Sequence, residues 1–86
     1  MRYKHNCTDC VDLGECENYD LYICQDINDE HHIHLIARFG DLERDFICCT
    51  TLDEIHDTPL DEAKERAIKQ GYLAPDDQFG YVFVKK

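Results

Sequence analysis

The sequence predicts a small α+β domain with an N-terminal zinc knuckle, an antiparallel sheet of about four strands and one helix. Three observations predict it: cysteines crowd into the first 24 residues, short apolar runs alternate with turn residues after them, and one amphipathic segment has clear helix boundaries. A chain of 86 residues suffices for one domain. We therefore expect a single unit over residues 1–86, with the knuckle in 1–24 and a hairpin, helix and terminal strand in 25–86.

Turn-forming residues separate the apolar runs. Residues 5–18 contain three cysteines, Gly14 and several acidic or amide side chains, so a loop is predicted there. The segments 28–30 and 40–41 have the composition of turns, and the second turn would close a hairpin. The predicted strands are residues 19–27, 32–39, 45–50 and 81–85.

The helix is bounded at both ends by residues suited to those positions. Thr58 would cap it, Pro59 suits the first helical position, and Gly71 would end it. Two acidic residues near the start favour the positive end of the helix dipole. The predicted buried face consists of Leu60, Ala63, Ala67 and Ile68.

The chain is strongly acidic, and the acidity is concentrated between its ends. Nineteen Asp and Glu oppose nine Lys and Arg, a formal charge of −10. Between residues 5 and 84 only five basic residues oppose all 19 acids, a balance of −14, and residues 5–37 contain no Lys or Arg. This charge excludes direct binding to nucleic acid or to an anionic membrane. It suits a partner protein with a basic surface, or else a solvated face that only aids solubility.

Cysteine usage indicates a metal site in a reducing compartment. The polar N-terminus has no signal-peptide pattern, and no apolar run is long enough to span a bilayer, so we expect a cytoplasmic protein. Disulfides are rare in a reducing cytosol, and adjacent cysteines at 48 and 49 fit poorly with a disulfide framework. Six cysteines in so short a chain then favour metal binding.

Four of these cysteines have a spacing suited to structural zinc. Two of them form a Cys-x-x-Cys pair, from which both thiolates can enter one tetrahedral site, and two more follow within 14 residues. The predicted ligands are Cys7, Cys10, Cys16 and Cys24. Alternatives stay open: Cys24 could simply pack in the core, and another ligand could come from His5, Cys48 or Cys49.

The histidines and the remaining motifs do not predict catalysis. His32 and His34 share a strand face, which predicts a polar, solvent-facing edge; a second metal site with His56 or an acid is the alternative. The chain has no serine, no HExxH pattern, and no room before its Cys-x-x-Cys pair for the strand that a thioredoxin-like site needs. We expect a protein that is not an enzyme.

A very small, acidic chain with a cysteine knuckle and no catalytic motif resembles the proteins that phages encode against host defences. It is most similar in character to anti-CRISPR proteins that inhibit type II RNA-guided nucleases, some of which contain zinc. The resemblance rests on Cys7-Thr8-Asp9-Cys10, Cys16 and Cys24, on the stretch without basic residues, and on the α+β remainder. The resemblance extends over the whole chain in its general character, but it includes no motif that only this class has.

The resemblance implies an inhibitor that acts in the bacterial host cell by binding the nuclease itself. Such a protein would block target-DNA loading or cleavage by occupying a positively charged channel. The expected contact residues are the acids of the N-terminal segment: Asp9, Asp12, Glu15, Glu17 and Asp20. The alternative function is a zinc-knuckle adaptor that binds another host protein of transcription or replication.

Overall fold

Four antiparallel strands form the main sheet in the computed structural model of the chain, which describes residues 7–40, 42–47 and 52–86. Each strand pairs with the next along the chain, so the sheet is a simple meander. Its strands are β1 (Val11–Cys16), β2 (Tyr19–Gln25), β3 (Ile33–Phe39) and β4 (Leu42–Ile47). The predicted fold class, α+β with an antiparallel sheet of about four strands and one helix, is confirmed.

Two predicted elements differ from the structure. The loop predicted over 5–18 contains β1, whose apolar alternation is interrupted by a β-bulge between Asp12 and Gly14. The predicted last strand does not join the main sheet: β6 (Gly80–Phe83) pairs with β5 (Leu73–Asp76) in a separate two-stranded sheet. The end of the strand predicted over 45–50 lies outside the described residues.

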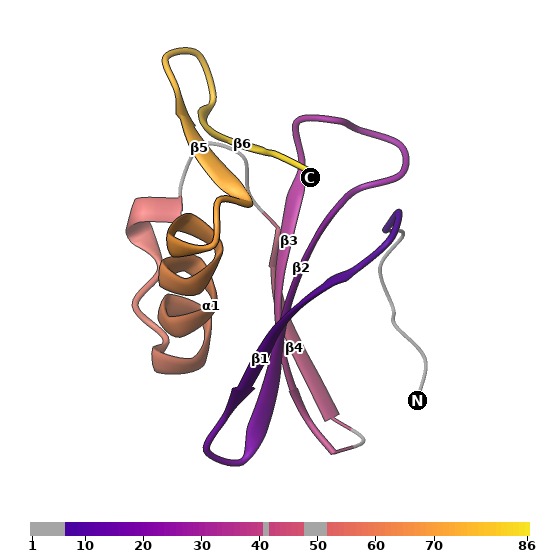
Figure 1. Cartoon of the computed structure of the whole chain (residues 1–86), viewed down its shortest axis with the longest axis vertical. Helices are drawn as coiled ribbons and strands as arrows, with labels where there is room; N and C mark the ends of the chain where they lie inside the picture. Colours follow the sequence, from indigo (N-terminus) through magenta and orange to yellow (C-terminus); the bar gives the residue numbers. More distant parts are fainter. Residues whose placement is uncertain (1–6, 41, 48–51) are drawn as a thin grey trace.

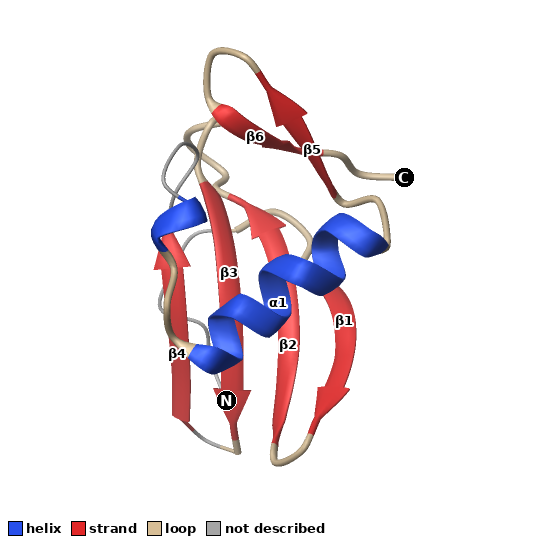
Figure 2. Cartoon of the chain, turned by 90° about the vertical axis from the view of Figure 1, so that its left-hand side faces the viewer, coloured by secondary structure: helices blue, strands red, loops and turns tan. Residues whose placement is uncertain are grey.

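One helix covers one face of the sheet. Figure 2 shows α1 (Thr58–Lys69) lying across β2 and β3, and a short 3-10 helix (Leu52–Glu54) precedes it. The core lies between them because alternate residues of the strands point to this face. Fully or almost fully buried residues here are Leu13, Leu21, Ile23, Ile33, Leu35, Ala37, Leu60, Ala63 and Ala67. In Figure 1 the small sheet of β5 and β6 lies beyond one end of the two layers formed by α1 and the main sheet.

The ends of α1 follow from backbone hydrogen bonds. Its N-cap residue is Asp57 and not the predicted Thr58. At the other end Gly71 has a φ of 86°, and the amide of Tyr72 donates to the carbonyl of Ala67, which together form a Schellman end. Ile68 is 41% exposed because it lies one position around the helix from Ala67, so its predicted burial is wrong. Within the described residues, no helix is long and apolar enough to cross a bilayer.

On the opposite face of the sheet, β3 and the end of β2 at Cys24 are buried as well. Cys24 is paired with His34, and Tyr22 with Ile36, so these side chains share the face turned away from α1. Cys24 and Ile36 are 0% exposed and His34 is 1% exposed. The expected solvent-facing histidine edge is therefore wrong at His34, because β3 is buried on both sides over the run Ile-His-Leu-Ile-Ala.

Two isoleucines near the end of β2 test this account of the core. Ile23→Ala should lower the free energy of unfolding by about 2–5 kcal/mol, because Ile23 is 0% exposed and truncation leaves a cavity. Ile27→Ala is the matched control: Ile27 is 60% exposed, so the change should stay within about 0.5 kcal/mol. Urea unfolding of both variants measures the difference, and equal losses would contradict the assigned core.

Candidate metal centre

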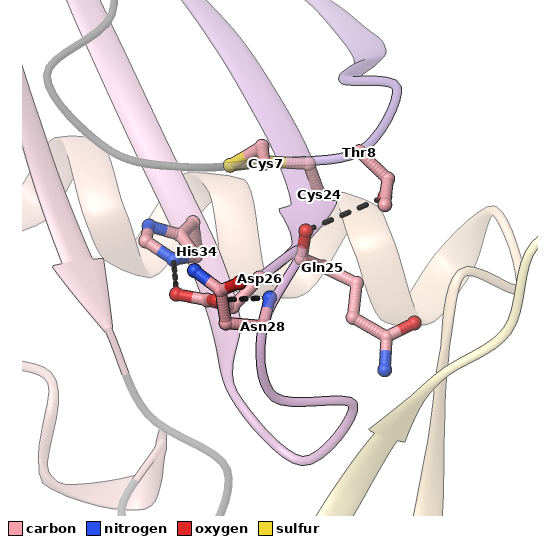
Figure 3. Close-up of a disulfide and its surroundings, with 7 residues drawn as sticks. All are labelled: Cys7, Thr8, Cys24, Gln25, Asp26, Asn28 and His34. Atoms are coloured by element: carbon pink, nitrogen blue, oxygen red, sulfur yellow. Dashed lines mark hydrogen bonds and ion pairs between the residues drawn. A yellow bond between two sulfur atoms is a disulfide. The ribbon is translucent and has the colours of Figure 1, made fainter.

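Two cysteines that precede β1 and one cysteine of β2 meet on the sheet face opposite α1. Cys24 belongs to β2 and points away from the helix, since its neighbour Ile23 points into the core. Cys7 forms an isolated antiparallel bridge with Asp26, and the amide of Thr8 donates to the carbonyl of Gln25 at 3.0 Å. The segment before β1 therefore runs back along the end of β2, which brings Cys7 beside Cys24 (Figure 3).

The sulfur atoms of Cys7, Cys10 and Cys24 all lie within 4.8 Å of one another. Three thiolates at this spacing could hold a thiophilic metal ion, because one ion accepts several sulfur ligands at about 2.3 Å. The structure also joins Cys7 and Cys24 as a disulfide, with their Cα atoms 5.9 Å apart. This corrects the expectation that the cysteines form no disulfides. The candidate ligands His5, Cys48 and Cys49 lie outside the described residues.

Cys16 lies away from the other three predicted ligands, on the face that packs against α1. The cause is a β-bulge in β1 between Asp12 and Gly14, where two residues of β1 oppose one of β2. Gly14 has a φ of 108°, which suits glycine, and the extra residue reverses which face the following side chains take. Without the bulge, Cys16 would share the face of Cys10 and Cys24. The predicted four-cysteine set is therefore not a single cluster in this structure.

The surroundings of Cys16 suit a partly buried thiol and not a metal ligand. Its sulfur donates to a carboxylate oxygen of Glu62 at 3.5 Å. A hydrogen bond with Cys16, together with burial and the nearby negative groups, raises the pKa of Tyr19 to about 12. Cys16 thus connects the β1–β2 hairpin to α1.

A buried histidine and a carboxylate lie next to the cluster, and we did not predict this pair. His34 is opposite Cys24 across the strands, and its Nε2 lies 3.2 Å from Oδ2 of Asp26 (Figure 3). The backbone amide of Asn28 donates to Oδ1 of Asp26 at 2.7 Å. This hydrogen bond is the main reason why the pKa of the Asp26 carboxyl lies below its usual range, and the hydrogen bond with His34 contributes less. The nearly continuous apolar run around His34 is the sequence signal that could have indicated its burial, because such runs are typical of strands buried on both faces.

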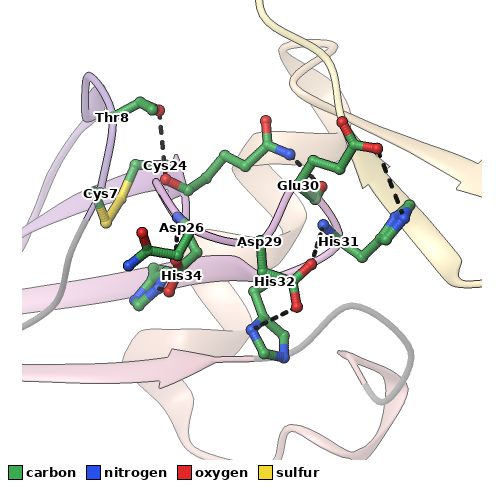
Figure 4. A network of polar contacts seen from close by, with 11 residues as sticks. Cys7, Thr8, Cys24, Asp26, Asp29, Glu30, His31, His32 and His34 are labelled. Atoms are coloured by element: carbon green, nitrogen blue, oxygen red, sulfur yellow. Dashed lines mark hydrogen bonds and ion pairs between the residues drawn. A yellow bond between two sulfur atoms is a disulfide. The ribbon is translucent and has the colours of Figure 1, made fainter.

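The loop between β2 and β3 binds its own histidines. His32 Nδ1 lies 3.3 Å from Asp29 Oδ2, and the His31 amide donates to Asp29 at 2.9 Å (Figure 4). The His31 ring also stacks on Phe79, with ring centroids 3.9 Å apart. Throughout the described part of the chain, the three cysteines are the one group with metal-ligand spacing. The alternative second site, formed by His32 and His34 with His56 or an acid, is thus not assembled among the described residues.

The predicted contact acids do not share one environment. Asp9 forms an ion pair with Lys85 at 2.6 Å, which lowers the pKa of its carboxyl. Asp12 accepts a hydrogen bond from the amide of Gly14 and supports the bulge. The other three border a shallow pocket at the β1–β2 turn, which Arg38 also lines: Glu15, Glu17 and Asp20.

Comparison with known proteins assigns no family. No protein-family model matches the chain, and neither the curated proteins nor the solved structures contain a significant match.

The Asp26 carboxylate predicts how stability depends on pH. Because folding lowers its pKa, Asp26 stabilises the folded state above its unfolded pKa of about 3.9, and this contribution is lost as the pH falls through the lower folded value. Asp26→Asn should therefore lose less stability than the wild type between about pH 5 and pH 2. Urea midpoints across this range measure the slope, with the exposed Asp77→Asn as the control for loss of one carboxylate. A slope in Asp26→Asn as steep as in the wild type would contradict the assignment.

Proposed function

We propose that the protein is an acidic inhibitor without enzymatic activity that binds a basic surface of a protein partner. The partner that the resemblance favours is a type II CRISPR effector nuclease, whose target-DNA loading or cleavage it would block. The observation that carries the proposal is the charge of the β1–β2 hairpin. Its carboxylates point outward or border a shallow pocket at the hairpin turn, and none of them forms an ion pair with another described residue.

The acids of α1 are balanced by nearby basic residues, whereas the hairpin acids are not, and this difference supports the hairpin as the binding surface. α1 has equal numbers of acidic and basic residues, and Arg66 lies 3.8 Å from Glu62. Arg66 also donates to the backbone carbonyl of Glu15 at 2.9 Å, so it supports the hairpin backbone and not its carboxylates. Among residues 7–40, 42–47 and 52–86, no ion pair is formed by the hairpin acids Asp12, Glu15, Glu17 and Asp20.

Unpaired carboxylates on one hairpin favour a cationic partner. Like charges held close together repel, and a positive surface relieves that repulsion and attracts the protein over a distance of about a Debye length. RNA-guided nucleases hold their nucleic acids in positively charged channels. An acidic domain of this size could occupy such a channel, and the competition needs no chemical step by the inhibitor.

We assign structural zinc to Cys7, Cys10 and Cys24, whose sulfur atoms lie close enough together to share one ion. The metal would fasten the segment before β1 to β2 and so support the hairpin that presents the acids. Three thiolates outnumber the two positive charges of Zn²⁺, so metal binding preserves the acidic character of the chain. Structural metal ions of this kind are common in domains with small cores.

Zinc content of single variants tests the ligand assignment. Protein purified under reducing conditions should contain about one zinc per chain, and Cys10→Ser should lose most of it because a thiolate ligand is removed. Cys16→Ser is the matched control and should keep the zinc, since Cys16 lies on the other face of the sheet. Elemental analysis measures both. Equal losses in the two variants would contradict the assignment.

Charge reversal tests the binding surface. The triple variant Glu15→Lys, Glu17→Lys, Asp20→Lys should weaken binding to a type II effector nuclease by at least about tenfold, with a weaker dependence on salt. The control Glu54→Lys, Glu65→Lys, Asp77→Lys makes the same charge change at exposed positions elsewhere and should affect binding less. Biolayer interferometry and a DNA-cleavage assay give the two readouts.

Unimpaired cleavage by several type II nucleases in the presence of the protein would contradict the inhibitor proposal. Capture of a host transcription or replication protein through the same three acids, with cleavage unaffected, would favour the adaptor instead. If both triple variants weaken binding equally, total charge and not the hairpin accounts for the interaction.

A further inference from the structure

Two of the three clustered cysteines take part in two arrangements that exclude each other. Cys7 and Cys24 are joined as a disulfide, and the same two residues belong to the group that could hold a metal ion. A disulfide sulfur is neutral, whereas zinc binds the thiolate. Their Cα separation of 5.9 Å suits a disulfide, and their sulfurs lie within 4.8 Å of Cys10, so one backbone arrangement serves both.

We propose that the cluster is a redox-controlled metal site with two mutually exclusive states, one bound to zinc and one closed by a disulfide. In the reduced chain Cys7, Cys10 and Cys24 bind zinc, and in the oxidised chain Cys7 and Cys24 form the disulfide and the metal is released. The inference rests on the proposed zinc assignment and adds its regulation. The co-reactant is a low-molecular-weight disulfide, such as the oxidised form of a cellular thiol.

The exposure of the cysteines decides where exchange begins. Cys24 is 0% exposed, whereas Cys7 is partly exposed and can be reached from solvent. The Cys7 thiolate attacks one sulfur of the small disulfide, whose S–S bond breaks, and the first small thiolate leaves. The Cys24 thiolate then attacks the sulfur of Cys7, which forms the Cys7–Cys24 bond and expels the second small thiolate.

The exchange balances without a further reactant. Two electrons pass from Cys7 and Cys24 to the small disulfide, which is reduced to two thiols after it takes up two protons from solvent. Zn²⁺ leaves as the aqueous ion because two of its three described ligands have lost their charge. Excess small thiol reverses each step, so the site returns to the metal-binding state.

Both states fasten the same segment to β2. The bridge between Cys7 and Asp26 and the hydrogen bond from Thr8 to Gln25 align this segment whether the link is a disulfide or a metal ion. The reduced, metal-free chain lacks both links and is the least stable form. Cys10 separates the two states, since it belongs to the metal site and not to the disulfide.

The test compares wild type, Cys10→Ser and Cys16→Ser. Each full-length protein is reduced, loaded with zinc and treated with oxidised glutathione, while a chromogenic chelator measures released zinc and peptide mapping identifies the disulfide. Wild type and Cys16→Ser should release one zinc for each Cys7–Cys24 bond formed and rebind it after reduction. The oxidised form should bind zinc at least about 100-fold more weakly. Cys10→Ser should form the same disulfide while binding little zinc.

Thermal melting adds an independent readout. The zinc-bound and the oxidised wild type should both melt at least about 5 °C above the reduced, metal-free form. Zinc that stays bound after oxidation, or a disulfide that forms between other cysteines, would overturn the redox coupling and leave the zinc assignment standing. Reduced wild type that binds no zinc would overturn both. If zinc is exchanged as expected but the wild type does not bind the nuclease through the hairpin acids, only the inhibitor proposal is overturned.

Discussion

Burial of β3 on both faces, together with burial of Cys24 at the end of β2, is the constraint on which the rest of the structure depends. On one side Ile23 and Leu35 pack beneath α1, and on the other side Cys24 and His34 are closed off from solvent. The same pairing places the buried histidine beside the cluster, where Asp26 binds its ring. The chemistry of this face therefore follows from the pairing of two strands.

One inserted residue decides which cysteines meet. The bulge before Gly14 turns Cys16 toward Glu62 and α1, while Cys10 stays on the face of Cys24. Alternation alone would have placed both on one side, so a single extra residue in an edge strand separates a cysteine of the cluster from a cysteine that packs against α1. The Asp12 side chain supports this backbone by accepting the amide hydrogen of Gly14.

The sequence allowed the fold class and the helix to be predicted, because a 3.6-residue apolar repeat and a glycine terminator are local signals. Three of the four proposed ligands meet, since Cys-x-x-Cys spacing and a cysteine in the next apolar run bring them into reach. The position of Cys16, the burial of His34 and the pairing of β6 with β5 depend on contacts between distant residues. No local pattern encodes these contacts, and β1 was not predicted because the bulge at Gly14 interrupts its alternation of apolar and polar residues.

The cysteine cluster and the acidic surface lie at opposite ends of one hairpin. The cluster lies where β1 begins and β2 ends, and the acids lie farther along β1 and at the β1–β2 turn. X-ray absorption at the zinc edge of reduced protein tests the sulfur ligation most directly. At least three sulfur ligands at about 2.3 Å are expected, unchanged in Cys16→Ser. A shell made only of nitrogen and oxygen at about 2.0–2.2 Å would contradict the thiolate site.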